Sequence, residues 1–298
     1  MKVLLVQADG KWPNLPLMKL STSHKRMGDQ VFLGCCESPD QVYVSCVFTK
    51  NRDAAYGMAR FYPEAEIFFG GSGFNLSSKL PDEIEHEMPD YALYGIDYSI
   101  GFTSRGCIRN CPWCIVPQKE GQIREHSQFE EFVHLDHSKV LLLDNNFLAS
   151  PNCVEKLNWL HYSFCKVSFN QGLDIRLVTE EIAGLLADVK YCDGDFNERR
   201  LYFSFDQPAI LEQVKKGIDF LNSAGIKSSS LMFYFLCNFN TTFEEEQERF
   251  KTLLDLGVDP FCMNYGTPDA ERLDFARYVN SQRCARKMSF QEFRERGL

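Results

Sequence analysis

Long apolar runs are absent from this sequence of 298 residues. None approaches the roughly 18 consecutive apolar residues that a helix needs to cross a bilayer. The opening MKVLLVQADG turns polar too soon for a secretory signal, so we expect a cytoplasmic protein with no membrane partner. Low-complexity segments and internal repeats are missing as well. Hydrophobic residues make up 44% of the chain and aromatic residues 13%, which is enough to fill the core of a globular protein.

Positive charge is also in short supply. The chain has 32 Lys and Arg against 41 Asp and Glu, which gives a formal net charge of −9. A nucleic-acid-binding surface needs cations for phosphate contacts, so the composition does not indicate a nucleic-acid partner. The exception is the tail from Glu271 to Leu298, where seven Lys and Arg stand against four Asp and Glu. That tail is either a solvated helix face or a docking site for an anionic partner.

A second Cys-x-x-Cys pair is lacking, although the chain contains twelve cysteines. Disulfide scaffolds are typically small secreted chains, whereas this chain is long and apolar enough to fold unaided, so we expect reduced thiols. Three cysteines gather in GFTSRGCIRNCPWCIVPQKEG, where Cys107, Cys111 and Cys114 are separated by three residues and then by two. The adjacent pair Cys35 and Cys36 is expected to be buried on a strand.

The spacing of the three gathered cysteines lets the chain wrap one compact metal centre. Structural zinc needs four ligands, but no fourth cysteine follows at a finger-like distance, and the nearest histidines are His126 and His134. Thiolates also bind iron and sulfide, and a four-iron cluster held by three thiolates keeps one iron open for a substrate or cofactor. Structural zinc and three coincidental core cysteines stay open as alternatives.

From Tyr98 onward, β-rich apolar runs alternate with helical patterns, which is typical of repeated βα units and a parallel sheet. The capping pairs Asn152 with Glu155 and Thr242 with Glu245 mark two helix starts. Six units over about 170 residues are fewer than the eight of a complete barrel of about 250 residues. We therefore expect an open, partial (β/α)6 barrel of the TIM type. The six expected strands begin at Tyr98, Lys139, Lys166, Leu201, Leu231 and Phe261.

The first 96 residues contain shorter strand patterns separated by helical or turn segments, which predicts a small doubly wound α/β domain. The polar stretch from Ser77 to Asp90 contains two prolines and is the natural connector. We expect an α/β protein with three parts. They are a Rossmann-like domain over 1–90, the partial barrel over 97–268 and a C-terminal helical extension over 269–298.

The motif Cys107-x3-Cys111-x2-Cys114 has Trp113 before its last cysteine and follows the first strand of the expected barrel. It resembles the signature of the radical S-adenosylmethionine (SAM) superfamily, in which three thiolates hold a [4Fe–4S] cluster and SAM chelates the fourth iron. The resemblance implies an enzyme that reductively cleaves SAM to a 5′-deoxyadenosyl radical, which abstracts hydrogen from a substrate. It also implies an electron donor such as flavodoxin or ferredoxin. It identifies neither the substrate, the reaction subclass nor a catalytic side chain.

The resemblance also implies SAM-binding positions, because the site of a parallel βα array lies at the carboxyl ends of its strands. Asp144, Asn145 and Asn146 stand where relatives carry Gly-Gly-Glu for the SAM amino group, and a plain turn is the other interpretation. Asp206 takes the place of a ribose-binding residue or caps the helix at Pro208. The stretch LCNFN replaces a Gly-rich segment that packs on adenine. The implied SAM contacts are Trp113, Asp144, Asn145, Asn146, Ser204, Asp206, Leu236 and Asn238.

Substrate contacts are expected where further polar side chains follow the strands. The stretch FNQGLDIRL places several of them around Gly172, and a buried structural network would explain them equally well. Cations near the cysteines would suit an anionic group, although solvated loop charges are the simpler interpretation. Met263, on the last strand, is expected in the core. The candidate substrate residues are Lys119, Asn170, Gln171, Asp174 and Arg176.

The first domain resembles the cobalamin-binding domain of many radical SAM enzymes in architecture only. The ligand pattern Asp-x-His-x-x-Gly is missing, and His24 lies within a predicted helix without the flanking residues, so cobalamin is not expected. The segment GGSGF and the polar residues after the first strand, Asp9 among them, still mark a candidate ligand edge. We expect a degenerate domain that shapes the substrate entrance or mediates dimer contact.

A different class of function stays open, namely a non-enzymatic iron–sulfur electron carrier or a zinc-stabilised binding module. An electron carrier needs neither six βα units nor an open iron. The other nine cysteines contain no second Cys-x-x-Cys set, which argues against a methylthio-transferring enzyme with two clusters.

Overall fold

The computed structural model describes residues 1–297, apart from the side chain of Arg283, as an α/β protein with parallel sheets. Two compact units make up the chain. The first contains residues 1–103 and 126–140, and the second contains residues 104–125 and the chain from 141 onward. Compact units need not coincide with domains that fold alone, so the expected domain boundaries stay a prediction.

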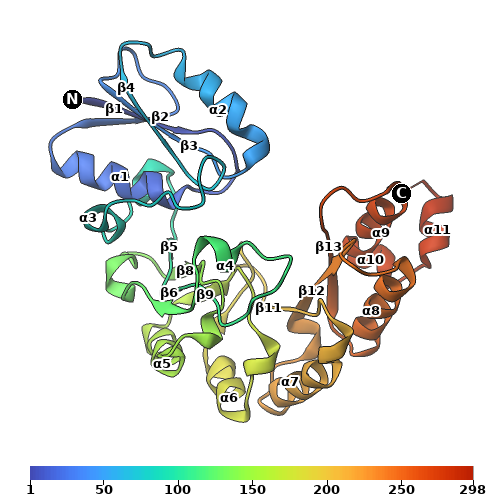
Figure 1. Ribbon diagram of the computed structural model, residues 1–298. Coiled ribbons are helices and arrows are strands. Elements are labelled where there is room, and N and C mark those ends of the chain that lie inside the picture. The colour runs from blue at the N-terminus through green and yellow to red at the C-terminus, as the bar shows by residue number, and fades with distance from the viewer. Residues whose placement is uncertain (298) are drawn as a thin grey trace. The chain divides into compact units, whose positions relative to one another are not determined.

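The first unit is built on a four-stranded parallel sheet with the order β2-β1-β3-β4. Helix α1 (Leu15–Arg26) packs on one face and α2 (Arg52–Ala59) on the other, so the sheet is doubly wound (Figure 1). The short helix α3 (Asp82–Glu85) forms within the expected connector. The strands are β1 (Lys2–Gln7), β2 (Gln30–Leu33), β3 (Gln41–Ser45) and β4 (Glu66–Gly70).

The central strand β1 is apolar at successive positions because both of its faces are covered. Val3 and Leu5 pack with Leu17 of α1. Leu4 belongs to a second buried cluster with Ala55 of α2. The near-continuous apolar run at the start of the chain is therefore explained by helices on both faces of the sheet.

Strand β2 ends at Leu33, before the two adjacent cysteines. Gly34 has a φ of +87°, a left-handed conformation that turns the chain out of the strand. Cys35 beyond it is exposed and Cys36 is half-buried. The expectation that these two cysteines are buried on a strand is therefore wrong.

The six strands expected from Tyr98 onward are all present. They fall into two parallel sheets, β10-β9-β8-β5 and β11-β12-β13. A parallel bridge between Leu173 and Phe203 connects the segment after β9 to β11. The strands are β5 (Ser99–Gly101), β8 (Lys139–Leu142), β9 (Lys166–Phe169), β10 (Lys190–Tyr191), β11 (Leu201–Ser204), β12 (Leu231–Cys237) and β13 (Asp259–Asn264).

Helices alternate with the strands along the chain from β8 onward (Figure 1). The capping pair of Thr242 and Glu245 is confirmed, because each side chain accepts the other's backbone N–H. The prediction of a capping pair at Asn152 and Glu155 is wrong. The backbone of Asn152 is not extended, and its side chain makes no capping hydrogen bond. The helices are α5 (Cys153–Ser163), α6 (Glu180–Asp188), α7 (Leu211–Ser223), α8 (Phe243–Asp255), α9 (Ala270–Asn280), α10 (Gln282–Ala285) and α11 (Phe290–Glu295).

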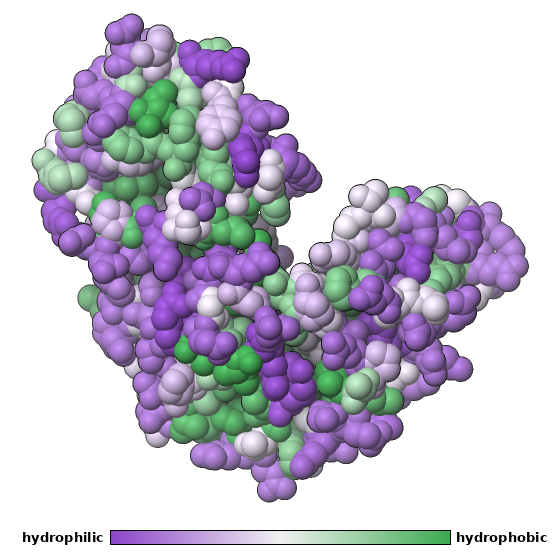
Figure 2. Space-filling view, in the orientation of Figure 1, coloured by the Kyte–Doolittle hydropathy of each residue, from purple (hydrophilic) through white to green (hydrophobic). Residues whose placement is uncertain are grey.

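Polar residues predominate on the face drawn in Figure 2, and apolar residues form smaller patches between them. Within residues 1–297, no helix has the length and apolar character needed to cross a membrane.

Two helical glycines test the packing of the helices in the second unit. A methyl group at Gly217 in α7 would lie 2.6 Å from the Ile175 side chain, whereas a methyl group at Gly184 in α6 meets nothing within 4 Å. We expect Gly217→Ala to lower the free energy of unfolding by about 1–3 kcal/mol through overpacking. Gly184→Ala should raise it by about 0.5–1 kcal/mol, because alanine loses less backbone entropy in a helix. Urea unfolding under reducing conditions measures both, and equal effects of the two changes would contradict this packing.

Candidate functional site

The three gathered cysteines lie on one closed loop. Strands β6 (Ser104–Arg105) and β7 (Arg124–Glu125) pair antiparallel and bring the ends of residues 106–123, here called the cysteine loop, together. Gly106 has a φ of +86°, and a Cβ there would lie 2.2 Å from the carbonyl oxygen of Gln122. Only glycine fits this position without moving the backbone. The short helix α4 (Val116–Lys119) lies inside the loop.

Three consecutive side chains after β8 hold the start of this loop. The carboxylate of Asp144 accepts hydrogen bonds from the backbone N–H and the hydroxyl of Ser104, both at 2.6 Å. The side-chain oxygen of Asn145 accepts from the Gly106 N–H at 3.0 Å. The amide nitrogen of Asn146 donates to the Cys107 sulfur at 3.3 Å. The segment expected to contact SAM therefore fixes the loop that carries the cysteines.

The sulfur atoms differ in their surroundings. Cys107 Sγ accepts a second hydrogen bond, from the backbone N–H of Arg109 at 3.3 Å, and Cys114 Sγ accepts one from the Val116 N–H at 3.5 Å. Burial raises the pKa of the Cys111 thiol, and the nearby charges of Cys114 and Cys107 raise it further. The three thiols thus lie close enough to act on one another electrostatically.

The three gathered cysteines offer thiol donors of the kind that bind iron and sulfide. Among residues 1–297, no group of three or more His, Cys, Asp or Glu side chains converges in a way that could hold one metal ion. A four-iron cluster binds each thiolate to a different iron, so its ligands need not converge on one point. Hydrogen bonds from N–H groups to the sulfur, such as those to Cys107, are the contacts that tune such clusters. The chemistry of these donors, thiols with N–H groups on the sulfur, is compatible with such a cluster.

Asn146 offers a further observation on this fit. Its residue is only 4% exposed, and its side-chain oxygen Oδ1 is buried without a hydrogen-bond partner. An unsatisfied buried acceptor is costly. The oxygen belongs to the same amide group that donates to Cys107, so an unsatisfied acceptor lies beside the first cysteine.

The buried carboxylate of Asp174 pairs with two arginine side chains near the cysteines. Asp174 accepts hydrogen bonds from Arg109 of the cysteine loop at 2.8 Å and from Arg176 at 2.6 Å. Burial works to raise the pKa of Asp174, but the two guanidinium groups outweigh it and hold the pKa below its usual value. The charge of Arg176 also acts on the pKa of Cys111 and lowers it. Of the other two candidate substrate residues on this segment, Asn170 is half-buried and Gln171 is exposed.

A second carboxylate, Glu120, anchors the other side of the cysteine loop. Its side chain is 6% exposed and pairs with Arg105 at 3.3 Å, with Arg124 at 3.7 Å and with Lys119 at 4.0 Å. The three cations are therefore ion-paired with Glu120, and the interpretation that they are solvated loop charges does not describe them fully. Lys119, the candidate substrate residue among them, lies at the edge of this group.

Asp206 lies at the carboxyl end of β11, next to half-buried Ser204. Burial raises the pKa of Asp206 to about 6, although the backbone N–H of Leu236 and the charge of Arg249 oppose the shift. That N–H donates to the carboxylate at 2.9 Å. The short 3-10 helix Pro208–Ile210 that precedes α7 has Gln207 at its N-cap and no side-chain capping bond, so Asp206 does not cap the helix at Pro208. Asp206 also acts electrostatically on Cys111, which places it in the same neighbourhood as the cysteines.

Asn238 is held in a network that the sequence did not reveal. It has a φ of +64°, its backbone N–H donates to Glu246 at 2.7 Å, and its side chain donates to the Tyr265 carbonyl at 2.8 Å. Glu246 is fully buried and pairs with Arg272 at 2.9 Å. In the sequence Glu246 closes the acidic run FEEE, which looks like an exposed helix start. Nothing in that pattern identifies Glu246 as a buried anchor that joins the end of β12 to α9.

An aromatic row joins the cysteine loop to the ends of β12 and β13. Trp113 packs edge-on to Phe239 with ring centroids 5.4 Å apart, and Phe239 packs edge-on to Tyr265 at 4.9 Å. Met263, on β13, is 46% exposed, so the expectation that it fills the core is wrong. Side chains alternate along a strand, and its neighbour Cys262 takes the inward position.

The candidate ligand edge of the first unit is occupied by its own side chains. Asp9 accepts hydrogen bonds from the backbone N–H groups of Val47 and Phe48, each at 2.8 Å. Gly71 and Gly73 lie against the backbone of Cys46, where a Cβ would lie within 3 Å of the Cys46 carbonyl oxygen. The glycines of GGSGF are therefore explained by close packing. His24 is buried and pairs with Asp29 at 2.8 Å.

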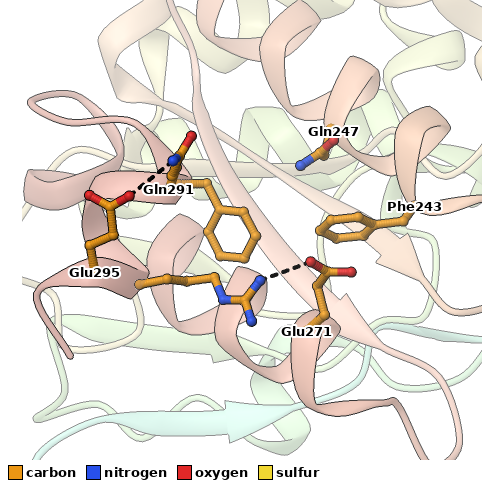
Figure 3. Close-up of a pocket in the computed structure, with 7 residues that line it drawn as sticks. Phe243, Gln247, Glu271, Gln291 and Glu295 are labelled. Atoms are coloured by element: carbon orange, nitrogen blue, oxygen red, sulfur yellow. Dashed lines mark hydrogen bonds and ion pairs between the residues drawn. The ribbon is translucent and has the colours of Figure 1, made fainter.

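Two surface pockets lie apart from these residues. One of about 560 Å³ is formed by α8, α9 and α11, and its polar groups pair with one another, as Arg294 does with Glu271 at 2.9 Å (Figure 3). The other, of about 680 Å³, lies between α2 and β4 and is lined by Tyr56 and Phe69 among others. Neither contains a cysteine of the loop or a side chain from the strand ends.

No protein-family model matches the chain, and no curated protein matches it. The interpretation of the site therefore depends on its residues and their geometry.

The raised pKa of Asp206 makes a prediction about stability. The folded state keeps a proton on Asp206 up to about pH 6, whereas an unfolded chain releases it near pH 4, so this group lowers stability as pH rises through that window. Asp206→Asn should therefore stabilise the protein at about pH 8 and have little effect at about pH 4. Chemical unfolding of the metal-free protein at both pH values measures the difference. Asp219→Asn, at an exposed position of α7, is the control, and the same pH dependence in both variants would contradict the assignment.

Proposed function

We propose that the protein is a radical SAM enzyme. The observation that carries the proposal is the set of Cys107, Cys111 and Cys114 on one closed loop, at three- and two-residue intervals, with N–H groups donating to the Cys107 sulfur. These thiolates would hold a [4Fe–4S] cluster. With SAM bound, that group supplies the one-electron chemistry that generates a carbon-centred radical for hydrogen abstraction from a substrate.

We also propose that the second unit contributes to an open barrel of six βα units. The six expected strands occur in chain order, and the Leu173–Phe203 bridge joins the segment after β9 to β11, which supports this arrangement. The carboxyl ends of such strands would surround the cysteine loop. Water would then be kept away from the reaction by the side chains at these ends.

The residues after the strands take different parts in this proposal. Asn146 would orient Cys107 through its amide nitrogen, and it stays a proposed SAM contact. Asp144 and Asn145 would act through the loop, because their side chains already hold Ser104 and Gly106. The remaining proposed SAM contacts are Trp113, Ser204, Asp206, Leu236 and Asn238.

The substrate would lie near the charged pair of Asp174 and Arg176. Lys119, Asn170 and Gln171 stay candidates for contacting it. Flavodoxin or ferredoxin is the proposed class of electron donor, and cytoplasm is the proposed compartment. No cobalamin is proposed for the first unit, because its sequence lacks the ligand pattern Asp-x-His-x-x-Gly.

Anaerobic reconstitution with iron and sulfide tests the proposed function. We expect about four irons and four sulfides per chain, and release of 5′-deoxyadenosine from SAM that depends on dithionite. Cys111→Ala should abolish that release because it removes a cluster ligand. Cys153→Ala, at the first residue of α5, should leave it intact. One zinc per chain without 5′-deoxyadenosine would support the zinc-stabilised module instead, and iron without SAM cleavage would support an electron carrier.

The Asn146 hydrogen bond can be tested without turnover. Loss of a hydrogen bond to a metal-bound ligand typically costs about 10–100-fold in metal affinity. We therefore expect Asn146→Leu to lose iron to a chelator at least about tenfold faster than the unaltered protein. Asn222→Leu, on the exposed side of α7, is the matched control. Equal rates of iron loss in the two variants would show that Asn146 does not support the cluster.

A further inference from the structure

Strand β4 forms an open edge of the sheet in the first unit. The backbone N–H of Glu66 donates to the Asp40 carbonyl at 3.0 Å, so Glu66 bonds toward β3. Backbone groups alternate in direction along a strand, and those of Ile67 and Phe69 therefore point away from β3. Within residues 1–297, these outward groups have no hydrogen-bond partner. Such an edge is free to pair with a further strand.

Aromatic side chains are exposed on both faces of β4. Phe68 stacks on Tyr43 with ring centroids 4.7 Å apart and is 37% exposed. On the other face Phe69 packs edge-on to Tyr56 of α2 at 4.8 Å and is 38% exposed, and both residues line the pocket of about 680 Å³ between α2 and β4. Edge strands are usually protected from pairing by lysine, proline or a bulge, and the sequence EIFFG contains neither lysine nor proline.

We propose that β4 pairs antiparallel with β4 of a second copy of the chain, about a two-fold axis at Phe68. Ile67 then lies opposite Phe69 of the second copy, and their outward N–H and C=O groups form the hydrogen-bonded pairs of an antiparallel ladder. Phe68 meets its own counterpart at the non-hydrogen-bonded position, where side chains lie closest. The two sheets join into one, and neither β4 edge stays open. This inference does not depend on the proposed function.

The charges beside β4 fit this two-fold arrangement. Asp53 lies in the first turn of α2 and Arg60 at its end, and both line the pocket beside β4. Antiparallel pairing brings the amino end of one β4 to the carboxyl end of the other, so Asp53 of each copy approaches Arg60 of the other copy. Glu66 lies opposite Gly70 of the second copy, so the register places no like charges opposite each other along the strands.

A second copy is favoured over another occupant because this edge is complementary to itself in hydrogen bonds, apolar side chains and charge. Two-fold pairing uses the same strand on both copies and stops at a dimer. Pairing of β4 with β2 of another copy would instead continue into an open filament. The apolar side chains of β2 are half-buried, whereas Phe68 and Phe69 of β4 are exposed, so the two-fold pair covers more apolar surface.

Sedimentation velocity of the full chain under reducing conditions tests the proposal. We expect the unaltered protein to sediment as a dimer. Phe68→Lys places two ammonium groups opposite each other at the axis and should give a monomer. Phe164→Lys, the same change at a residue after α5 that is 68% exposed, is the matched control and should leave the dimer intact. An unaltered protein that stays monomeric at about 100 μM would overturn the proposal, and so would equal sedimentation of the two variants.

Charge reversal tests the arrangement without altering the strand, so it still applies if Phe68→Lys fails to fold. Asp53→Arg and Arg60→Asp should each raise the dissociation constant of the dimer about tenfold at low ionic strength, because like charges then approach each other. The double variant restores opposite charges and should return the constant to within about threefold of the unaltered value. Absence of this rescue would overturn the two-fold arrangement, and filaments in place of dimers would assign β4 to pairing with β2.

The register can be tested by a disulfide across the axis. The Cα atoms of a non-hydrogen-bonded antiparallel pair lie about 4.5 Å apart, which is within the range that a disulfide spans. Phe68→Cys should therefore link two copies under mild oxidation, whereas Phe69→Cys should not link to its own counterpart, because Ile67 lies opposite it. Mass spectrometry of the digested dimer separates this link from links through the native cysteines. A link at position 69 without one at position 68 would overturn the register.

Discussion

The carboxylate of Asp144 is the contact on which the rest of the site depends. It is 3% exposed and accepts both the N–H and the hydroxyl of Ser104, so the end of β8 fixes the residue at which the cysteine loop begins. The side chains of Asn145 and Asn146 make the next hydrogen bonds to the loop, at Gly106 and Cys107. A buried carboxylate is tolerated only when donors satisfy it. The strand end and the loop consequently hold each other in place.

A few carboxylates that solvent hardly reaches fix the positions of the cations near the cysteines. Asp174 and Glu120 each hold more than one cation, whereas Asp206 is disfavoured as an anion by its burial. A thiolate-bound cluster carries negative charge, and the guanidinium of Arg176 acts on Cys111 in the sense that favours the thiolate. The surroundings of the three sulfurs therefore balance burial, which opposes negative charge, against cations, which support it.

Local patterns made the strands and the cysteine loop predictable from sequence. The six apolar runs after Tyr98 became strands, and the Thr242 capping pair formed, because both depend on near neighbours in the chain. The partners of Asp144 and Asn146 lie about 40 positions earlier, at Ser104 and Cys107, and no single sequence pattern pairs them. Glu246 was missed for the same reason, since its partner Arg272 is 26 positions away. Contacts of long sequence separation are decided by the packed fold, which a pattern of residue types does not encode.

The aromatic row of Trp113, Phe239 and Tyr265 gives the cysteine loop a third point of support, besides the β6–β7 pair and the residues after β8. None of these supports involves a metal. A zinc finger, by contrast, loses its fold with its ion, because the ion is its main cross-link. The shape of the cysteine loop is consequently held by the polypeptide itself, without a metal as its main cross-link.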